Sequence, residues 1–195
     1  MTGDGRTALS GSTDGTVRVW DLGEGHCTAV LKEHTDAVVD LAVTKDGRTA
    51  VSGSSDRTIR VWDLASGRCT AVLEGHTGRI DSVAVTADGR TVVSRSDNRW
   101  VCVWDVACSR CTATHEEGSK AARRVWATAT NGLASTTAIE REPYGLTFRD
   151  TTSRAILARF PGSFTDAACS SDRRRVIAGD GRGGVYLLRL HTRDV

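Results

Sequence analysis

The sequence predicts an all-β protein assembled from successive copies of one four-stranded unit. Trp-Asp pairs recur at Trp20, Trp62 and Trp104, which are separated by equal intervals of 42 residues. Residues 4–34 align without a gap with residues 46–76, and 22 of these 31 positions are identical. A fixed period between about 20 and 50 residues indicates a repeat architecture. Within each period, short β-branched runs alternate with turns rich in Gly, Asp and Ser, which is typical of β-strands.

The unit is clearest in its second copy, where an apolar first strand is expected at 38–43. The hairpin turn Asp46-Gly47 follows, since Asp-Gly supplies the positive φ angles that such turns need. The remaining strands of this copy are predicted at 49–53, 58–62 and 69–73. A sheet of four strands cannot cover both of its own faces, so the copies are expected to stack radially as blades of a β-propeller.

The same frame extends along the whole chain. Strands are predicted at 80–85, 91–94, 100–104 and 111–114 in the third copy, at 125–129, 133–137, 144–148 and 156–160 in the fourth, and at 164–169, 175–178 and 185–188 in the fifth. The first copy lacks its first strand and the fifth lacks its last. We therefore expect about five blades, the first and last incomplete, at approximately 1–34, 35–76, 77–118, 119–162 and 163–195.

The predicted strands number 18, which is not a multiple of four. We therefore expect the chain to be the C-terminal part of a longer propeller with a larger ring. The alternative is a short chain whose open blade edges pair with a second copy, because unpaired sheet edges are sites of self-association.

The period, the Trp-Asp pairs and a His at a fixed offset make the chain resemble the WD40 repeat family, strongly over residues 1–118 and weakly over 119–195. The resemblance implies a hydrogen-bonded structural tetrad of His, Ser, Asp and Trp in each blade. The matching residues are His34, Ser52, Asp56 and Trp62 in the second blade, His76, Ser94, Asn98 and Trp104 in the third, and Ser10, Asp14 and Trp20 in the first. Asn98 keeps an acceptor but loses the charge, so the third blade should be held less firmly.

These residue types also occur in catalytic triads, but a catalytic site would occur once, whereas this set recurs with the repeat. The resemblance therefore implies a non-enzymatic protein–protein interaction scaffold that binds a protein or peptide on its upper face. The implied contact residues are Thr13 in the first blade, Ala37, Val39 and Ser55 in the second, and Arg79, Asp81, Asp97 and Arg99 in the third. Ordinary solvated loops are the alternative interpretation of this group. An alternative function is a C-terminal sensor or autoinhibitory module of a larger bacterial signalling NTPase or kinase.

Composition argues against several other classes. A net charge of +2 is too small to predict nucleic-acid binding, and no run of about 18 apolar residues predicts a membrane span. Six cysteines include Cys27, Cys69 and Cys111 at the repeat interval, and Cys108 forms an isolated Cys-x-x-Cys pair with Cys111. We expect reduced, small, buried cysteines, no metal or cofactor, and a cytoplasmic location.

Overall fold

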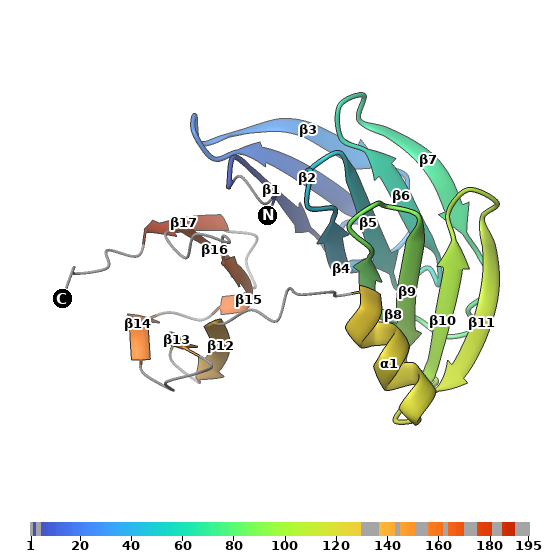
Figure 1. Cartoon of the computed structure of the whole chain (residues 1–195). Helices are drawn as coiled ribbons and strands as arrows, with labels where there is room; N and C mark the ends of the chain where they lie inside the picture. Colours follow the sequence, from blue (N-terminus) through green and yellow to red (C-terminus); the bar gives the residue numbers. More distant parts are fainter. Residues whose placement is uncertain are drawn as a thin grey trace.

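The structure is a computed structural model that describes residue 2, residues 5–129 and the backbone of six later strands. Three antiparallel sheets, each formed from strands adjacent in sequence, fan side by side in the first half of the chain (Figure 1). The first sheet contains β1 (Thr7–Gly11), β2 (Thr16–Asp21) and β3 (His26–Lys32). The second contains β4 (Val38–Val43), β5 (Thr49–Ser54), β6 (Ile59–Asp63) and β7 (Arg68–Leu73). The third contains β8 (Ile80–Val85), β9 (Thr91–Ser96), β10 (Trp100–Asp105) and β11 (Arg110–Glu116).

The first hairpin of the second sheet shows how sequence produces the turns. Gly47 has a φ of 71°, the left-handed conformation predicted for the Asp-Gly turn. The Thr44 hydroxyl donates to Asp46 Oδ1 at 2.6 Å, and the backbone N–H of Arg48 donates to the same oxygen at 3.0 Å. The turn between β4 and β5 is therefore specified by the sequence of its own few residues.

The hydrophobic core lies between the sheets. Ile59 and Leu73 of the second sheet pack in one buried cluster with Ile80, Val92 and Trp104 of the third. Gly53 allows the close approach, because a Cβ there would lie 2.5 Å from the Cγ2 atom of Ile80. The sheets thus cover one another's apolar faces, as the repeat predicted.

A polar contact joins the innermost strands of the second and third sheets. The Asp40 Oδ2 atom on β4 accepts from the Ser82 hydroxyl at 2.7 Å and from the backbone N–H of Val83 at 2.8 Å. Both strands have a register shift at this level, beside Val39 and Asp81. The carboxylate therefore binds backbone and side-chain donors of the neighbouring sheet.

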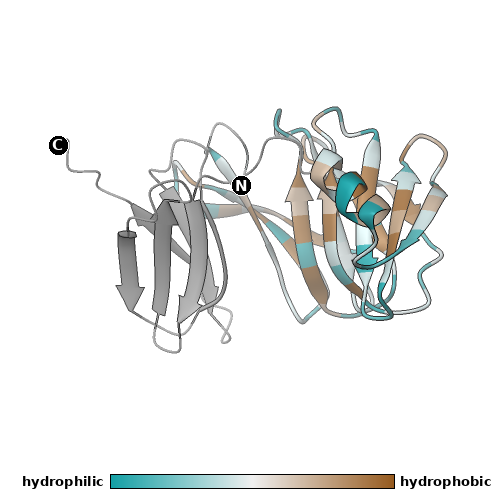
Figure 2. Ribbon diagram, turned by 60° about the horizontal axis from the view of Figure 1, so that its bottom comes forward, coloured by the Kyte–Doolittle hydropathy of each residue, from teal (hydrophilic) through white to brown (hydrophobic). Residues whose placement is uncertain are grey.

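The prediction of a strand at 125–129 is wrong, because Lys120–Ala129 forms the helix α1. Ala122, Val125, Trp126 and Ala129 follow helical spacing and pack on a cluster with Val93 of the third sheet. The strands beside α1 are hydrophobic over much of their length (Figure 2). Ser119 caps the helix, because its hydroxyl accepts the backbone N–H of Ala122 at 3.1 Å. In the described part of the chain, no helix is long and apolar enough to cross a membrane.

The later strands form two antiparallel sheets of three. One contains β12 (Thr137–Glu142), β13 (Gly145–Asp150) and β14 (Ile156–Pro161), and the other contains β15 (Phe164–Cys169), β16 (Arg175–Asp180) and β17 (Val185–Arg189). Strands were predicted close to β13 to β17, whereas the predicted strand 133–137 overlaps β12 only at Thr137, and 133–136 lie outside the described residues. Because a helix replaces the first strand of the fourth unit, the strands described number 17 rather than 18.

Candidate functional site

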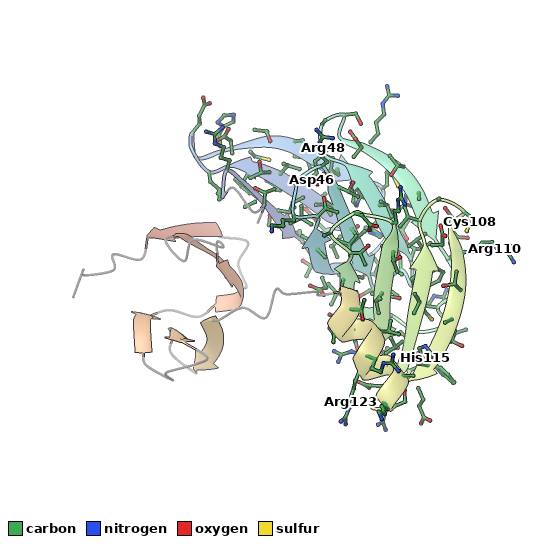
Figure 3. All side chains as sticks on the ribbon, in the orientation of Figure 1. Asp46, Arg48, Cys108, Arg110, His115 and Arg123 are labelled. Atoms are coloured by element: carbon green, nitrogen blue, oxygen red, sulfur yellow. The ribbon has the colours of Figure 1, made fainter. Side chains whose placement is uncertain are left out.

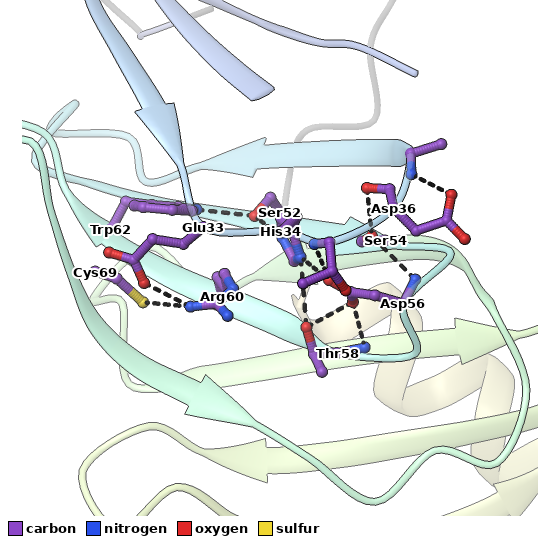
Figure 4. Close-up of polar contacts among 12 residues, drawn as sticks. Glu33, His34, Asp36, Ser52, Ser54, Asp56, Thr58, Arg60, Trp62 and Cys69 are labelled. Carbon is purple, nitrogen blue, oxygen red and sulfur yellow. Dashed lines mark hydrogen bonds and ion pairs between the residues drawn. The ribbon is translucent and has the colours of Figure 1, made fainter. Parts of the chain in front are cut away.

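A hydrogen-bonded group joins four side chains from separate parts of the second unit (Figure 4). His34 precedes β4, Ser52 lies in β5, Asp56 in the β5–β6 turn and Trp62 in β6. The His34 Nδ1 atom is 2.7 Å from Asp56 Oδ2, and its Nε2 atom is 2.7 Å from Ser52 Oγ. The Trp62 indole N–H donates to the same Ser52 oxygen at 2.8 Å. The structure therefore brings the four tetrad residues of this unit together.

Electrostatics define the protonation state of this group. Burial opposes ionisation of Asp56, but hydrogen bonds from Thr58, His34 and Thr35 outweigh it and lower the pKa of Asp56 to about 2. Burial lowers the pKa of His34, although the Asp56 carboxylate acts in the opposite direction. At neutral pH the ring is therefore neutral: Nδ1–H donates to Asp56, and Nε2 accepts the Ser52 hydroxyl proton.

The position of Ser52 determines what this group can do chemically. The residue is 0% exposed, and its oxygen accepts the indole N–H while its proton is directed at His34. A nucleophilic serine needs an oxygen that a substrate can reach. The arrangement gives each buried polar group a hydrogen-bond partner, and it joins β5 and β6 to the loop before β4 that carries His34.

The third sheet repeats the group with a different histidine contact. His76 Nε2 lies 2.6 Å from Ser94 Oγ, which also accepts the Trp104 indole N–H at 2.8 Å. Asn98 hydrogen-bonds to Ser96 and, at 2.7 Å, to Thr77, rather than to the histidine. His76 Nδ1 instead faces the Cys102 sulfur at 3.9 Å. In the third sheet a thiol therefore lies beside Nδ1, where the second sheet has a carboxylate.

The first sheet keeps only part of the group. The Trp20 indole N–H donates to Ser10 Oγ at 2.9 Å. Asp14 accepts the backbone N–H and the hydroxyl of Thr16, at 2.9 and 2.7 Å, as Asp56 does with Thr58. The Asp14 carboxylate therefore makes the same contacts in its turn as Asp56 does, although no histidine lies beside it in the described chain.

Most of the predicted contact residues lie in loops, whereas Val39 and Asp81 lie at the second position of β4 and β8, and the structure joins only some of the set. Ala37 and Ser55 are linked by a backbone hydrogen bond of 2.8 Å. Arg79 and Asp97 form an ion pair of 3.1 Å in addition to a backbone hydrogen bond of 3.0 Å. The other four are placed separately: Thr13, Val39 and Asp81 are exposed, and Arg99 pairs with Glu117 at 3.8 Å.

Two residues of interest were missed by the sequence analysis. Trp100 begins β10 beside these loops, and 46% of it is exposed. Its repeat counterpart Thr58 is small, so the replacement of Thr by Trp at this repeat position was the signal that could have identified it. Cys102, which faces His76, is the other: its repeat counterparts are Arg18 and Arg60.

The prediction of buried cysteines is wrong for most of the five thiols that are described. All five are free, but only Cys102 is buried; Cys27 and Cys69 are half-buried, and Cys108 and Cys111 are exposed. Cys111 lies on β11, the edge strand of its sheet, and every residue of β11 is exposed or half-buried. The sixth, Cys169, lies outside the described side chains.

Comparison with known proteins agrees with this geometry. A stretch of 44 residues is 52% identical to Cell division control protein 4 of Candida albicans, and it covers 22% of this chain but only 6% of that protein. The WD40 family model, described as WD domain, G-beta repeat, matches residues 1–21, 25–63 and 67–105, about half of the chain. This protein belongs to the WD40 repeat family.

Proposed function

We propose that this chain is a non-enzymatic protein-binding module that holds a peptide segment against the loop end of its third sheet. The observation that carries the proposal is the exposed indole of Trp100 among charged loop residues. Large aromatic side chains with arginine neighbours are enriched where binding energy concentrates in protein interfaces.

The charges around Trp100 define the chemistry of the peptide. Arg79 pairs with Asp97, and Arg95 and Arg99 both pair with Glu117. The Arg79–Asp97 pair is exposed and the pairs with Glu117 are half-buried, so a partner can exchange with them without uncovering a fully buried charge. A segment with an apolar or aromatic residue flanked by charges of both signs fits this surface.

Rigid display is the proposed mechanism. The loops are held by backbone hydrogen bonds, from Asp97 N–H to the Arg79 carbonyl at 3.0 Å and from Glu117 N–H to the Arg99 carbonyl at 2.8 Å. Binding to loops that are already ordered loses less conformational entropy than binding to mobile ones. The buried hydrogen-bonded groups of the second and third sheets support the same ends of the strands.

The arrangement of the sheets in the whole chain is part of the same proposal. We infer that the sheets are successive blades of a propeller, about five in this chain, in a ring larger than the chain. The fanned arrangement of the first three supports this inference (Figure 1). A cytoplasmic scaffold is the setting that we propose. The alternative is a sensor module within a larger signalling NTPase or kinase. An NTPase or kinase motif elsewhere in the intact gene product would favour that alternative.

The proposal is tested with peptides selected on the full chain from a random displayed library. A selected peptide should lose at least about tenfold in affinity for Trp100→Ala, as expected for an aromatic anchor. Reversing the charges of Arg79 and Asp97 should also weaken the binding of the selected peptide. Fluorescence polarisation measures both effects, and Val30→Ala on the outer strand β3, where the side chain is also exposed, is the matched control. Equal affinity for wild type and Trp100→Ala would reject the site.

A further inference from the structure

The segment that follows the third sheet is held beside Trp100. In the strand register Trp100, the first residue of β10, lies opposite Glu116, the last residue of β11. The next residue, Glu117, donates its backbone N–H to the Arg99 carbonyl at 2.8 Å. The helix α1 begins shortly afterwards at Lys120, so its first turn lies at the same end of the third sheet as Trp100.

The face of α1 that points away from the sheet is cationic. The apolar face of the helix packs on the third sheet, and at 3.6 residues per turn the positions 120, 123 and 124 lie on the opposite side. Lys120, Arg123 and Arg124 occupy these positions and are exposed, and the sequence of the helix contains no acidic residue. Within the described residues none of the three side chains takes part in an ion pair.

Neither helix stability nor the repeat accounts for these cations. Cations near the start of a helix are unfavourable, because the helix dipole favours anions there. The residues 42 positions earlier in the repeat are Gly78, Asp81 and Ser82, none of which is basic. The positive charge is therefore a feature of this part of the chain that folding does not require.

The carboxylate that precedes α1 is already shared. Glu117 lies 3.1 Å from a guanidinium nitrogen of Arg95 and 3.8 Å from one of Arg99. One carboxylate thus serves two guanidinium groups, and the cations of α1 are left to interact with groups that bind from outside.

We propose that the segment bound beside Trp100 is acidic: it carries Asp or Glu residues next to its apolar anchor, and these lie along the outer face of α1. The inference rests on the proposed function, because it extends the same surface and gives the sign of the added charge. Each exposed charge pair contributes a factor of about 1.5–5 in affinity, and complementary charges also raise the association rate.

The surroundings of Trp100 favour a protein segment over a nucleic acid. Asp97, Glu116 and Glu117 lie at the same end of the sheet, where they would repel the closely spaced phosphates of a nucleic acid. A peptide can place its carboxylates beside α1 alone, and its neutral or basic residues can lie beside these acidic groups.

The experiment starts with peptides selected on the full chain from a random displayed library and then labelled with a fluorophore. The selected peptides should be enriched in Asp and Glu relative to the starting library. Fluorescence polarisation should show weaker binding as the salt concentration rises, because exposed charge pairs are screened. Replacing the Asp and Glu of a selected peptide with Asn and Gln should reduce its affinity about tenfold and remove most of the salt dependence.

Charge reversal on the protein identifies where the peptide carboxylates bind. The test variant combines Arg123→Glu with Arg124→Glu, and the control combines Arg48→Glu with Arg110→Glu, which changes the net charge by the same amount. All four arginines are exposed, and Figure 3 shows that Arg110 and Arg123 lie at opposite ends of the third sheet. The test variant should bind acidic peptides about tenfold more weakly, whereas the control should change affinity by no more than about twofold.

A third variant checks that charge, rather than helix structure, is responsible. Arg123→Lys combined with Arg124→Lys should keep the affinity within about twofold, because both charges remain. Circular dichroism should show that all variants retain the fold of the wild type.

The outcomes separate this inference from the proposed function. Selected peptides that lose affinity for Trp100→Ala but bind the test variant and the control equally would overturn the inference and leave the proposed function intact. Peptides that need the α1 cations but not Trp100 would reject the proposed function and the placement of the acidic segment beside Trp100. A labelled single-stranded DNA oligonucleotide is the last probe. If it bound more tightly than every selected peptide and lost binding in the test variant, the face would be assigned to nucleic acid and the inference would be wrong.

Discussion

Replacing Ser52 with alanine tests the importance of the buried hydrogen-bonded group. The substitution removes one oxygen from a fully buried site, so it leaves little space but two unsatisfied polar groups. These are the indole N–H of Trp62, a residue 1% exposed, and the Nε2 atom of His34, whose side chain is 0% exposed. The change therefore isolates hydrogen bonding from packing.

The expected loss follows from the number of groups left without a partner. Each buried, unsatisfied polar group costs about 1–3 kcal/mol, so Ser52→Ala should lower the free energy of unfolding by about 2–6 kcal/mol. Ser10→Ala in the first sheet is the matched control, because it removes a single bond, to the half-buried Trp20. It should cost only about 1 kcal/mol.

Urea denaturation of the full chain, followed by tryptophan fluorescence and circular dichroism, measures these differences. Stacked sheets need not unfold in one step, so hydrogen exchange of the β5 and β6 amides should accompany the titration. A loss below about 1 kcal/mol for Ser52→Ala, or an equal loss for Ser10→Ala, would refute the reasoning.

Three further predictions concern pH and the contact between the second and third sheets. The pKa values of His34 and His76 are lowered by burial, so the unfolded chain binds protons first and stability should fall as pH drops below about 6.5. Asp56, with a pKa of about 2, should add a loss of at most about 2 kcal/mol between pH 4 and 2 after solvent screening, and Asp56→Asn should remove that step in a series of urea midpoints. Asp40→Asn should cost about 1–3 kcal/mol and speed amide exchange at Val83, because one carboxylate oxygen accepts two bonds from the third sheet. Unchanged exchange at Val83 would show that this contact does not hold the sheets together.

Much of the strand order could be predicted from the sequence because turns and strand alternation are local. The Asp46-Gly47 turn illustrates this, since its φ angle and hydrogen bonds involve only residues 44–49. The spacing of Ala122, Val125, Trp126 and Ala129 was also available as a helical pattern. Extending the 42-residue repeat concealed it, because the frame placed a strand there.

The repeat, the family and most strand positions could be inferred from the chain alone, because these depend on residues close together in the sequence. Three outcomes needed the three-dimensional arrangement: Asn98 hydrogen-bonds to Thr77 rather than to His76, Cys102 faces His76, and Trp100 remains half-exposed. Those outcomes depend on side-chain rotation and on which strands become neighbours. Neither is set by a periodic pattern, because equivalent positions in successive repeats hold different residues and therefore find different partners.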